Sequence, residues 1–570
     1  MATSSLPCAN CSPDGTSCQN AGQSGCANCR LVIYCSSECQ KAHWHLHKAH
    51  CKSPMNSENW RPEWVVQKRT PSFVPNNEVP TSSSFGGDSW LWGSVPALDV
   101  LELDANEGES YKGKLSLLFA ASGDIRNVVK TIAPLPLGWD QPIDITMNDI
   151  DFSIVARNAI ILLIAFTAGD ENEAIDCIIH IWYSSSIRKS DHAILEERIC
   201  PLIQTVCDKI KSKPADRVLG KTWIFGKRSL RLVLTKAAWD KLLSYATIPE
   251  DLTMERANQI RKAVTLAESH FDFLERHYLC AIPSHRVPPE RYREDGILQP
   301  FGTQRSEFTI LNPTFFQPPF HWPIPGGLDP RDGWSPKDLE DTDNGPATSD
   351  IYGKLLTHLR FMLKSFMSRI ANTNISFQLL NIEATKLLDQ LEEGSFDRIE
   401  VSNISDSVHL GPHLTVLVMS PLLRSLSDNP HATLITRFDA AIENAMTKED
   451  HRVGTQNERA QNETMAVLSD YLPMRRPPTC TWDVEIVKWQ YASELIRTYD
   501  HIYDRIAHNL EFHKFPEYLK VGIKDQNTII DKWPFRLKLK FGQEGAQQEF
   551  DRVMGQEITT KAFYLEFKRV

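Results

Sequence analysis

The chain has 570 residues, of which 41% are hydrophobic and 24% charged, and its 62 basic and 72 acidic residues give a net charge of −10. This composition is typical of a folded globular protein and excludes a collagen, a wholly disordered chain and a disulfide miniprotein. The acidic balance also argues against a phosphate backbone as a partner, so we expect no nucleic-acid binding. At about 150 residues per domain, the length predicts roughly three or four domains.

The first residues lack the basic start and apolar stretch of a secretory signal. The longest apolar run, at 159–169, is about half of the ~20 residues that a membrane-spanning helix needs. We therefore expect a soluble intracellular protein, cytoplasmic and/or nuclear, with no membrane partner. In such a compartment thiols stay reduced, and clustered cysteines indicate metal binding more often than disulfides.

Residues 1–52 are predicted to form a zinc module, because eight of the thirteen cysteines lie in the first 51 residues. Seven of them and one histidine have the pair spacings that tetrahedral Zn²⁺ uses. These candidate metal ligands are Cys8, Cys11, Cys26, Cys29, Cys35, Cys39, His47 and Cys51. Eight ligands make two structural zinc sites, because four protein ligands per ion leave no open position for water.

Two of the ligand pairs, Cys35/Cys39 and His47/Cys51, lie on one predicted helix. On an ideal helix their starting positions differ by ~120° in azimuth, so these two pairs are expected to bind different ions. Each must recruit a different one of the two Cys-x2-Cys pairs. Cys18 has no such partner and is expected to be a free thiol, and the other histidines of this helix are expected on its solvated surface.

The whole pattern, with Tyr34-Cys35, Cys39-Gln40, Trp44 and His47-Lys48, resembles the MYND zinc finger, a treble-clef-like fold. The resemblance implies interleaved pairs: Cys8, Cys11, Cys35 and Cys39 hold one zinc, and Cys26, Cys29, His47 and Cys51 hold the other. It also implies that Gln40 and Trp44 line a groove for proline-containing peptides. The alternative for Trp44 is a packing role within the finger.

A linker and an α/β body are predicted to follow the finger. Residues 53–92 are rich in proline and serine and are expected to form the linker. The body is divided into a first part at 93–215, an insertion at 216–350 and a second part at 351–570. The body is expected to be Rossmann-like, because strand and helix patterns alternate.

The elements of the body are predicted from apolar periodicity. The expected strands are 115–121, 143–147, a pair within 221–235 turning at Gly226, 375–382, 398–403, 414–420, 433–437, 534–541 and 562–568. The expected helices are 125–132, 153–168, 171–212, 236–246, 251–278, 351–370 and 482–508. The stretch 281–350 has little periodicity and is expected to be a packed irregular excursion or partly disordered.

A ligand signal lies in Ser122-Gly123-Asp124, which links the first predicted strand to a helix. In Rossmann-like sheets this turn brings a ligand to a helix N-terminus. Asn148-Asp149 ends the next strand, where an acidic residue can hold a ribose. The alternative for this pair is a helix N-cap.

Two resemblances extend over the body. From about residue 96 to 168, including Phe119-Ala-Ala-Ser-Gly-Asp124 and Asn148-Asp149-Ile-Asp151, the chain is similar to an uncharacterised domain of fungal MYND-finger proteins and of an axonemal dynein assembly factor. Segments at 60–64 and 69–73 also resemble the linker of the fungal proteins.

Phe377-Gln-Leu-Leu-Asn-Ile-Glu383, the segment 396–403 and the segment 414–419 resemble the middle strands of a class I S-adenosylmethionine methyltransferase. That resemblance implies Gly123 by the methionine part of the cofactor, Asp149 by the ribose and Glu383 by the adenine, and Asp124 is a further candidate cofactor-binding residue. The chain departs from the pattern because it lacks a Gly-x-Gly-x-Gly run.

No catalytic residue is identified, because the chain contains neither a His-Glu-x-x-His nor a Gly-x-Ser-x-Gly motif. The basic strand with Lys227, Arg228 and Arg231 is interpreted as a solvated face. We therefore expect a zinc-binding adaptor or scaffold that recognises proline-containing segments rather than an enzyme. The alternative is an S-adenosylmethionine-dependent methyltransferase whose finger recruits the substrate.

Overall fold

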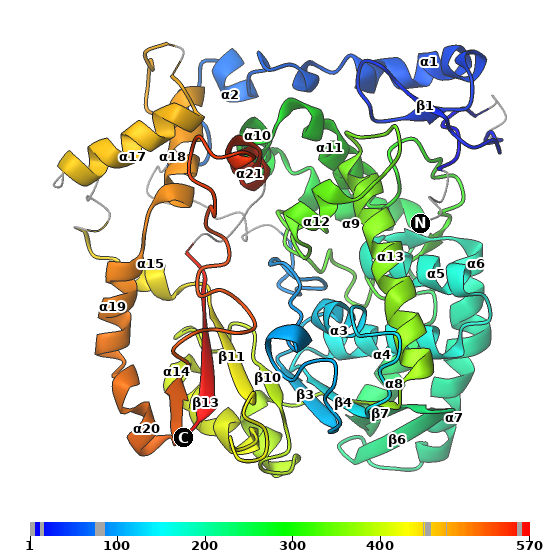
Figure 1. Ribbon diagram of the computed structural model, residues 1–570. Coiled ribbons are helices and arrows are strands. Elements are labelled where there is room, and N and C mark those ends of the chain that lie inside the picture. Colours follow the sequence, from blue (N-terminus) through cyan, green and yellow to red (C-terminus); the bar gives the residue numbers. More distant parts are fainter. Residues whose placement is uncertain are drawn as a thin grey trace.

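The structure is a computed structural model that describes residues 6–11, 16–74, 86–448, 450, 458–474, 476–555 and 561–570 (Figure 1). The predicted linker extends through 75–85, which lie outside the described residues. Within the described part of the chain, no helix combines the length and the apolar composition needed to cross a lipid bilayer.

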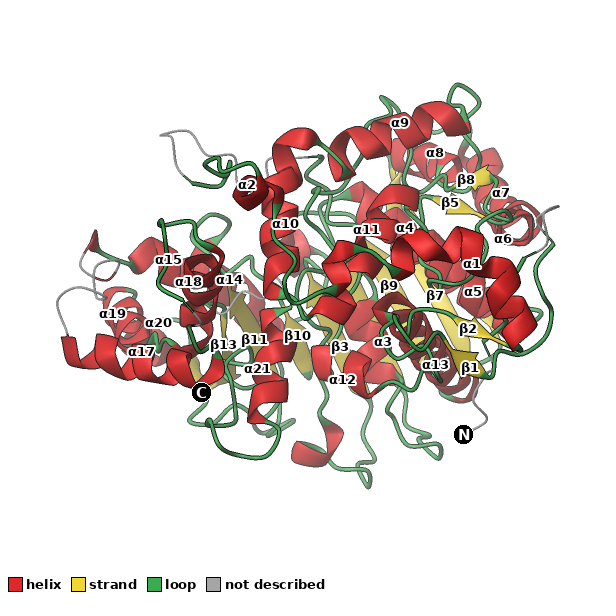
Figure 2. Cartoon of the chain, turned by 90° about the horizontal axis from the view of Figure 1, so that it is seen from above, coloured by secondary structure: helices red, strands yellow, loops and turns green. Residues whose placement is uncertain are grey.

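A nine-stranded sheet runs through the centre of the body, with helices on both of its faces (Figure 2). Its order is β12-β13-β11-β10-β3-β4-β9-β7-β6. The strands from β11 to β7 in this order are parallel, whereas β6 and β13 are antiparallel to their neighbours. The bounds are β3 (Leu115–Ala120), β4 (Ile143–Asn148), β6 (Val218–Phe225), β7 (Arg228–Thr235), β9 (Ile375–Leu380), β10 (Arg398–Glu400), β11 (Thr433–Phe438), β12 (Val521–Ile523) and β13 (Phe563–Arg569).

The central strand β3 separates two hydrophobic cores. Leu115, Leu117 and Phe119 pack into one core with helices such as α3 (Arg126–Ile132). Leu118 and Ala120 pack into the other core. Successive side chains of a strand point to opposite faces, so a strand buried on both faces reads as a continuous apolar run. This explains why β3 was recognised from its composition.

The remaining elements surround the sheet. The first half of the chain contains β1 (Ser24–Gly25), β2 (Ile33–Tyr34), α1 (Ser37–Cys51), α2 (Glu63–Val66), α4 (Phe152–Thr167), α5 (Glu171–Tyr183), β5 (Ser186–Ile187), α6 (Lys189–Ile194), α7 (Cys200–Ile210), α8 (Lys236–Ser244), α9 (Met254–Thr265) and α10 (Phe271–Cys280). The second half contains α11 (Val287–Asp295), β8 (Ile310–Leu311), α12 (Pro336–Asp341), α13 (Ile351–Asn372), α14 (Gly411–Met419), α15 (Ala441–Ala445), α17 (Glu458–Tyr471), α18 (Val484–Ile496), α19 (Asp500–Asn509), α20 (Phe515–Tyr518) and α21 (Ala546–Met554).

Two predicted strands are wrong. The segment 414–420 lies mostly in helix α14, which begins at Gly411-Pro412 and buries Val416 and Met419 while exposing Leu417. A short apolar run fits a buried strand and a buried helix equally well, and here the proline in the first turn favours the helix. The segment 534–541 is not a strand, because β13 pairs with β11 on one side and β12 on the other and leaves it no free edge.

Three predicted helices are interrupted. The stretch 171–212 contains β5, the stretch 251–278 divides into α9 and α10, and the stretch 482–508 divides into α18 and α19. The aperiodic stretch 281–350 is packed rather than open. Its aromatic side chains Phe315, Phe316 and Trp322 are buried in the first core. The stretch also contains α11 (Val287–Asp295), β8 (Ile310–Leu311) and α12 (Pro336–Asp341), so the expectation of an irregular stretch holds only between these elements.

The finger packs directly against the body. Leu31, Val32 and Tyr34 of the finger share a hydrophobic cluster with Tyr278 of α10 and Phe301. Figure 1 shows this N-terminal region lying along one side of the body, with α1 and α2 above α10 and α11. The geometry of the zinc module is therefore coupled to the packing of the body.

The first part of the linker is also fastened to α10. Asp272 accepts hydrogen bonds from the Arg69 guanidinium and from the backbone N–H of Ser72. Glu275 accepts one from the backbone N–H of Glu63 at 2.7 Å. These contacts position the chain that leaves the finger.

Candidate functional site

Helix α1 positions half of the candidate metal ligands. Its N-cap Ser36 accepts a hydrogen bond from the backbone N–H of Cys39 at 3.3 Å. The cap places Cys35 just before the helix and Cys39 in its first turn, with their sulfur atoms 3.5 Å apart. His47 and Cys51 follow in the later turns of the same helix.

Cys26, Cys29, His47 and Cys51 form one group of ligands. All four are buried, and their ligand atoms lie within 4.8 Å of one another. The sulfurs of Cys26 and Cys51 are 3.6 Å apart, and Cys29 Sγ lies 3.3 Å from His47 Nε2. Tetrahedral zinc with ~2.3 Å Zn–S bonds holds its sulfurs ~3.8 Å apart. The group therefore fits one zinc ion, with the four members that the sequence analysis assigned to it.

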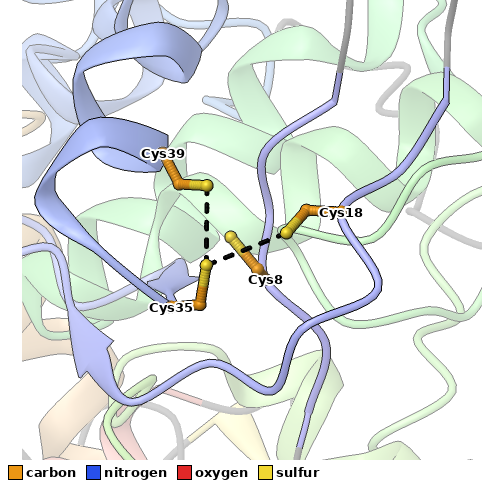
Figure 3. A group of neighbouring side chains, drawn as sticks. All are labelled: Cys8, Cys18, Cys35 and Cys39. Carbon is orange, nitrogen blue, oxygen red and sulfur yellow. Dashed lines mark hydrogen bonds between the residues drawn. The ribbon is translucent and has the colours of Figure 1, made fainter.

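The second group consists of Cys8, Cys18, Cys35 and Cys39. Figure 3 shows the four thiols turned toward one another around a common centre. Cys18 Sγ lies 3.8 Å from Cys35 Sγ, and all four sulfurs are within 4.8 Å of one another. This group also matches the sulfur spacing of tetrahedral zinc. It differs from the predicted set in one member, because Cys18 stands where Cys11 was expected.

The pairing of two short segments explains this difference. Backbone bridges join Pro7 to Ala21 and Cys11 to Ser17 in antiparallel fashion. Cys8 N–H donates to Asn20, and Cys18 N–H donates to Asn10, each at 2.9 Å. Side chains alternate between the two faces of extended chain, so Cys8 and Cys18 share one face while Cys11, three residues after Cys8, belongs to the other. The pair spacing alone could not reveal this.

Three asparagine amides contact the thiols, and the sequence analysis did not identify them. Asn28 donates to Cys51 Sγ at 3.3 Å, Asn10 to Cys39 Sγ at 3.4 Å and Asn20 to Cys35 Sγ at 3.9 Å. Such donors stabilise the thiolate form and orient it. A signal was present for two of them, Asn10 and Asn28, because the sequence Cys-Ala-Asn-Cys occurs at both 8–11 and 26–29.

Burial sets the protonation of these groups. It lowers the pKa of His47 to about 4, so the imidazole is neutral at pH 7, as a metal ligand must be. Burial also raises the pKa of the Cys8 thiol to about 12 and that of the Cys29 thiol further. The other thiols do not all follow this direction: at Cys26 burial raises the pKa but hydrogen bonds outweigh it and lower it, and a hydrogen bond with Cys35 lowers the pKa of Cys39. For the buried Cys8 and Cys29, a divalent cation supplies the charge that makes the thiolate favourable.

The exposed face of α1 carries the residues predicted to bind peptides. Trp44 is 37% exposed, and its ring meets that of His47 edge-on at a centroid distance of 6.2 Å. Gln40 is half-buried one turn before Trp44. His43 was expected on the solvated surface but is buried, where its Nδ1 lies 3.0 Å from the Tyr34 hydroxyl.

The residues predicted to bind a cofactor gather at the carboxyl ends of the parallel strands. Gly123 follows β3 with a φ of 57°, and Asp149 follows β4. The Asp149 carboxylate accepts hydrogen bonds from the backbone N–H groups of Gly123 and Asp151, both at 2.9 Å. Burial raises the pKa of Asp149 to about 6. This carboxylate therefore fixes its own loops, which is close to the capping alternative.

Asp124 is also used within the chain. Its carboxylate accepts hydrogen bonds from Trp182 Nε1 at 3.1 Å and from the Gly93 N–H at 3.3 Å, and it pairs with Arg126. Residues 93–100 continue along α3, where the Leu98 N–H donates to Asn127. This segment therefore occupies polar side chains in the first turn of the helix, among them Asn127 Oδ1 and Arg126 Nε.

Glu383 lies apart from these groups. Its side chain is 54% exposed and faces Lys386 at 3.5 Å. The neighbouring Asn381 donates to the backbone oxygen of Asp149 at 3.0 Å, so the end of β9 reaches the same edge of the sheet. The structure thus joins Gly123, Asp124 and Asp149 closely, and it leaves Glu383 at the rim.

Comparisons with known proteins match two separate regions of the chain, the finger and the first part of the body. Residues 8–51 match the family described as MYND finger, and residues 91–187 match a domain of unknown function, DUF4470. No solved structure matches the chain.

The curated relatives are similar to the finger region alone. N-lysine methyltransferase SMYD2 of Rattus norvegicus is 45% identical over 68 residues, which are 10% of this chain and 16% of the relative. The human protein of the same name is 46% identical over 48 residues, 8% of this chain and 11% of the relative. SMYD2-B of Danio rerio is 38% identical over 47 residues, 8% of this chain and 11% of the relative. The chain thus matches less than a fifth of the length of these relatives, and it contains a MYND finger with two Cys/His groups that fit zinc, followed by a DUF4470 domain within a mixed α/β body.

Proposed function

We propose that this protein is a zinc-dependent adaptor or scaffold whose finger binds proline-containing segments of partner proteins. The observation that carries the proposal is the exposed Trp44 ring, which stands on α1 directly against the candidate ligand His47. A zinc ion bound at His47 would fix the helix and hence the surface that it presents.

The chemistry of this surface suits such a peptide. Gln40 and Trp44 are separated by one helical turn and lie on one face of α1. A flat indole ring offers apolar area to a proline ring at low entropic cost, and proline-rich segments are already extended. The Gln40 amide can donate to a peptide carbonyl. The MYND finger is a protein-interaction module, which supports the assignment.

The test is direct binding of labelled decapeptides with a central proline to the full chain, measured by fluorescence anisotropy. We expect Trp44→Ala to weaken binding at least tenfold while elemental analysis still finds two zinc ions. Leu46→Ala is the matched control, because Leu46 is 49% exposed on the same helix but faces another direction. Equal binding by the Trp44 variant, or by peptides with alanine in place of proline, would place the surface elsewhere.

We also propose that both zinc ions are structural. One is held by Cys26, Cys29, His47 and Cys51, and four protein ligands leave no position for a reacting water. The other is held by Cys8, Cys18, Cys35 and Cys39. This second assignment replaces Cys11 by Cys18.

Zinc analysis of two single variants tests this replacement. Cys18→Ser should reduce the zinc content from two ions to one, whereas Cys11→Ser should retain two. The opposite result would restore the set expected from the Cys-x2-Cys spacing. Loss of an ion in both variants would mean that the two cysteines contribute jointly, which would contradict a purely structural four-ligand site.

The second candidate is an S-adenosylmethionine-dependent methyltransferase. One observation favours it: β4 and β9 lie on one side of β3, and β10 and β11 lie on the other. Ligands of open α/β sheets bind at such a switch point, outside the carboxyl ends of the strands. Gly123, Asp124 and Asp149 lie there, and Glu383 lies at the rim.

The hydrogen bonding at this edge favours the scaffold. The carboxylates of Asp149 and Asp124 both accept hydrogen bonds from neighbouring backbone and side-chain groups. A bound cofactor would have to displace these contacts. Isothermal titration with S-adenosylmethionine separates the two functions, because binding that is lost in Gly123→Asp supports the enzyme and no heat at millimolar ligand contradicts it.

The division of the chain completes the proposal. Residues 1–52 form the finger, 53–92 the linker, 93–215 and 351–570 the two parts of the body, and 216–350 an insertion. The strands β6 and β7 support an insertion that extends an existing sheet, because β7 adds in parallel to β9. The thirteen cysteines remain free of disulfides, which is consistent with an intracellular compartment.

A further inference from the structure

Among the strands that the structure describes, β6 lies at one edge of the central sheet and has no partner on its outer side. It spans eight residues, pairs with β7 along its whole length and is the last strand in the sheet order. Figure 1 shows β6 at the lower rim of the body. The opposite edge strand, β12, has only three residues. Long exposed edges are templates for a further strand, so proteins usually shorten or cover them.

The hairpin geometry shows which backbone groups are available. A two-residue turn, Gly226-Lys227, joins the paired residues Phe225 and Arg228. In such a hairpin the closing pair exchanges hydrogen bonds, and the residues that do so then alternate along the strand. The N–H and C=O groups of Gly220, Thr222 and Ile224 therefore point away from β7.

The side chains of this outer row are open to solvent. Ile224 is 75% exposed and Val218 is 58% exposed, and Gly220 and Thr222 between them are exposed as well. The opposite row is different, because Trp223 is buried against Trp239 of α8. The strand is thus anchored from one face and presents an apolar-polar row on the other.

The hairpin and its approach are strongly basic. Residues 209–236 contain nine lysines and arginines but a single acidic residue, in a chain whose net charge is −10. Lys211, Lys213, Arg217, Lys227 and Arg231 are exposed. In the described part of the chain, Lys236 alone of these nine basic residues forms an ion pair, with Asp240.

We propose that the free edge of β6 binds an extended acidic segment of a partner protein by strand addition. The outward backbone groups supply the hydrogen bonds, and the uncompensated positive charge selects acidic side chains at the two ends of the segment. Pairing with a second copy would bring two basic hairpins together, which like charge disfavours. A nucleic acid would use the charge but leave the outward amides unmatched.

The probe is a fluorescein-labelled nonapeptide with two acidic residues at each end and alternating valine and threonine between them, added to the full chain. We expect saturable binding by anisotropy, together with slower amide hydrogen exchange in the peptic fragment that contains 218–225. Two control peptides separate charge from strand pairing. Lysine in place of the acidic residues, and N-methylation of alternate central amides, should each weaken binding at least tenfold.

Two variants test the site on the protein. Arg217→Glu with Lys227→Glu should weaken binding about tenfold, because both side chains are exposed and lack ion pairs. Thr222→Pro removes one outward N–H from an edge position that tolerates proline and should also weaken binding, whereas Thr222→Val should not. Unchanged unfolding temperatures confirm the fold of each variant.

Several results would overturn the proposal. They are no binding at millimolar peptide, equal binding of the N-methylated peptide, tighter binding of a single-stranded oligonucleotide, and concentration-dependent dimers that form through β6 in light scattering. The first would mean that the basic residues only protect the edge from aggregation. The others would mean, in turn, that the hairpin binds acidic peptides by charge without strand pairing, that it binds nucleic acid, or that it pairs with a second copy of the chain.

Discussion

In the finger, thiol sulfurs and one imidazole nitrogen converge on two centres, with the spacing that a tetrahedral zinc ion requires. At the carboxyl edge of the sheet, the carboxylates of Asp124 and Asp149 already accept hydrogen bonds from the chain itself. Both regions bring together side chains that motifs had singled out. The two regions differ in whether these polar groups are available to bind a ligand or are already hydrogen-bonded within the chain.

This comparison shows how to distinguish a ligand-binding site from a group of polar side chains that only stabilises the fold. A buried polar group must be paired, and it can be paired either by the protein or by a ligand. The ligand atoms of the finger converge on two centres and favour an added ion at each. The carboxylates of the sheet edge are paired internally and favour a structural role.

The largest expected effect comes from removing a ligand of the fully buried zinc group. Cys51→Ser should release the zinc ion of this group and destabilise the finger, so that the zinc content falls from two ions to one or none, because zinc supplies on the order of 10 kcal/mol of folding free energy in such modules. Elemental analysis and limited proteolysis measure the two effects. Cys480→Ser is the control outside the finger. If the Cys51 variant keeps both zinc ions, the side chains of the finger, like those at the carboxyl edge of the sheet, do not depend on a ligand.

The next effect tests the contact between finger and body. Phe301 is buried against the finger, with its ring 5.1 Å from that of His50. Phe301→Ala should lower the free energy of unfolding by about 3–5 kcal/mol, because it opens a cavity in the shared cluster. Denaturant unfolding measures it. The exposed Phe361 is the control, and Phe361→Ala should change the value by less than about 0.5 kcal/mol.

A pH titration tests the structural role of Asp149. Burial raises its pKa to about 6 in the folded protein, above the ordinary value of 3.8. Folding therefore favours the protonated acid, and this stabilisation is complete below about pH 4 and is lost as the pH rises through 6. Asp149→Asn should remove a decline on the order of 2–3 kcal/mol over this window.

The exposed residue Asp140 provides the comparison for this titration. Asp140→Asn should leave the shape of the stability curve as it is in the parent protein. If the two variants have the same pH dependence, the Asp149 carboxylate is solvated, and it is then available to a ligand after all.

The smallest effect concerns the loop after β3. A Cβ at Gly123 would meet no atom closer than 3.8 Å, but the backbone φ of 57° is costly for any other residue. Gly123→Ala should therefore destabilise the protein by about 1–2 kcal/mol through backbone strain alone. Gly138 also has open space but no positive φ, so Gly138→Ala should be neutral or slightly stabilising in the same thermal unfolding measurement.

Sequence reasoning identified elements whose pattern is set locally, by a continuous apolar run or by a glycine turn. The strand 115–121 and the hairpin turning at Gly226 were placed within about three residues of their observed bounds. It failed where the choice depends on partners. The segment 414–420 satisfies a strand and a helix equally, and 534–541 has the alternation of a strand but both sides of its expected partner β13 are occupied by β11 and β12.

For the candidate zinc sites, spacing in the sequence by itself determined that Cys35/Cys39 and His47/Cys51 serve different ions, and the resemblance to the MYND finger implied that Cys26 and Cys29 join His47 and Cys51. Only the tertiary structure decided the fourth member of the other group. The pairing of 7–11 with 17–21 turns Cys18 toward Cys8 and Cys11 away from it. The register of this backbone pairing decides on which side of the paired segments each cysteine lies. The register is a contact between two loops, and it cannot be read from the spacing of the cysteines.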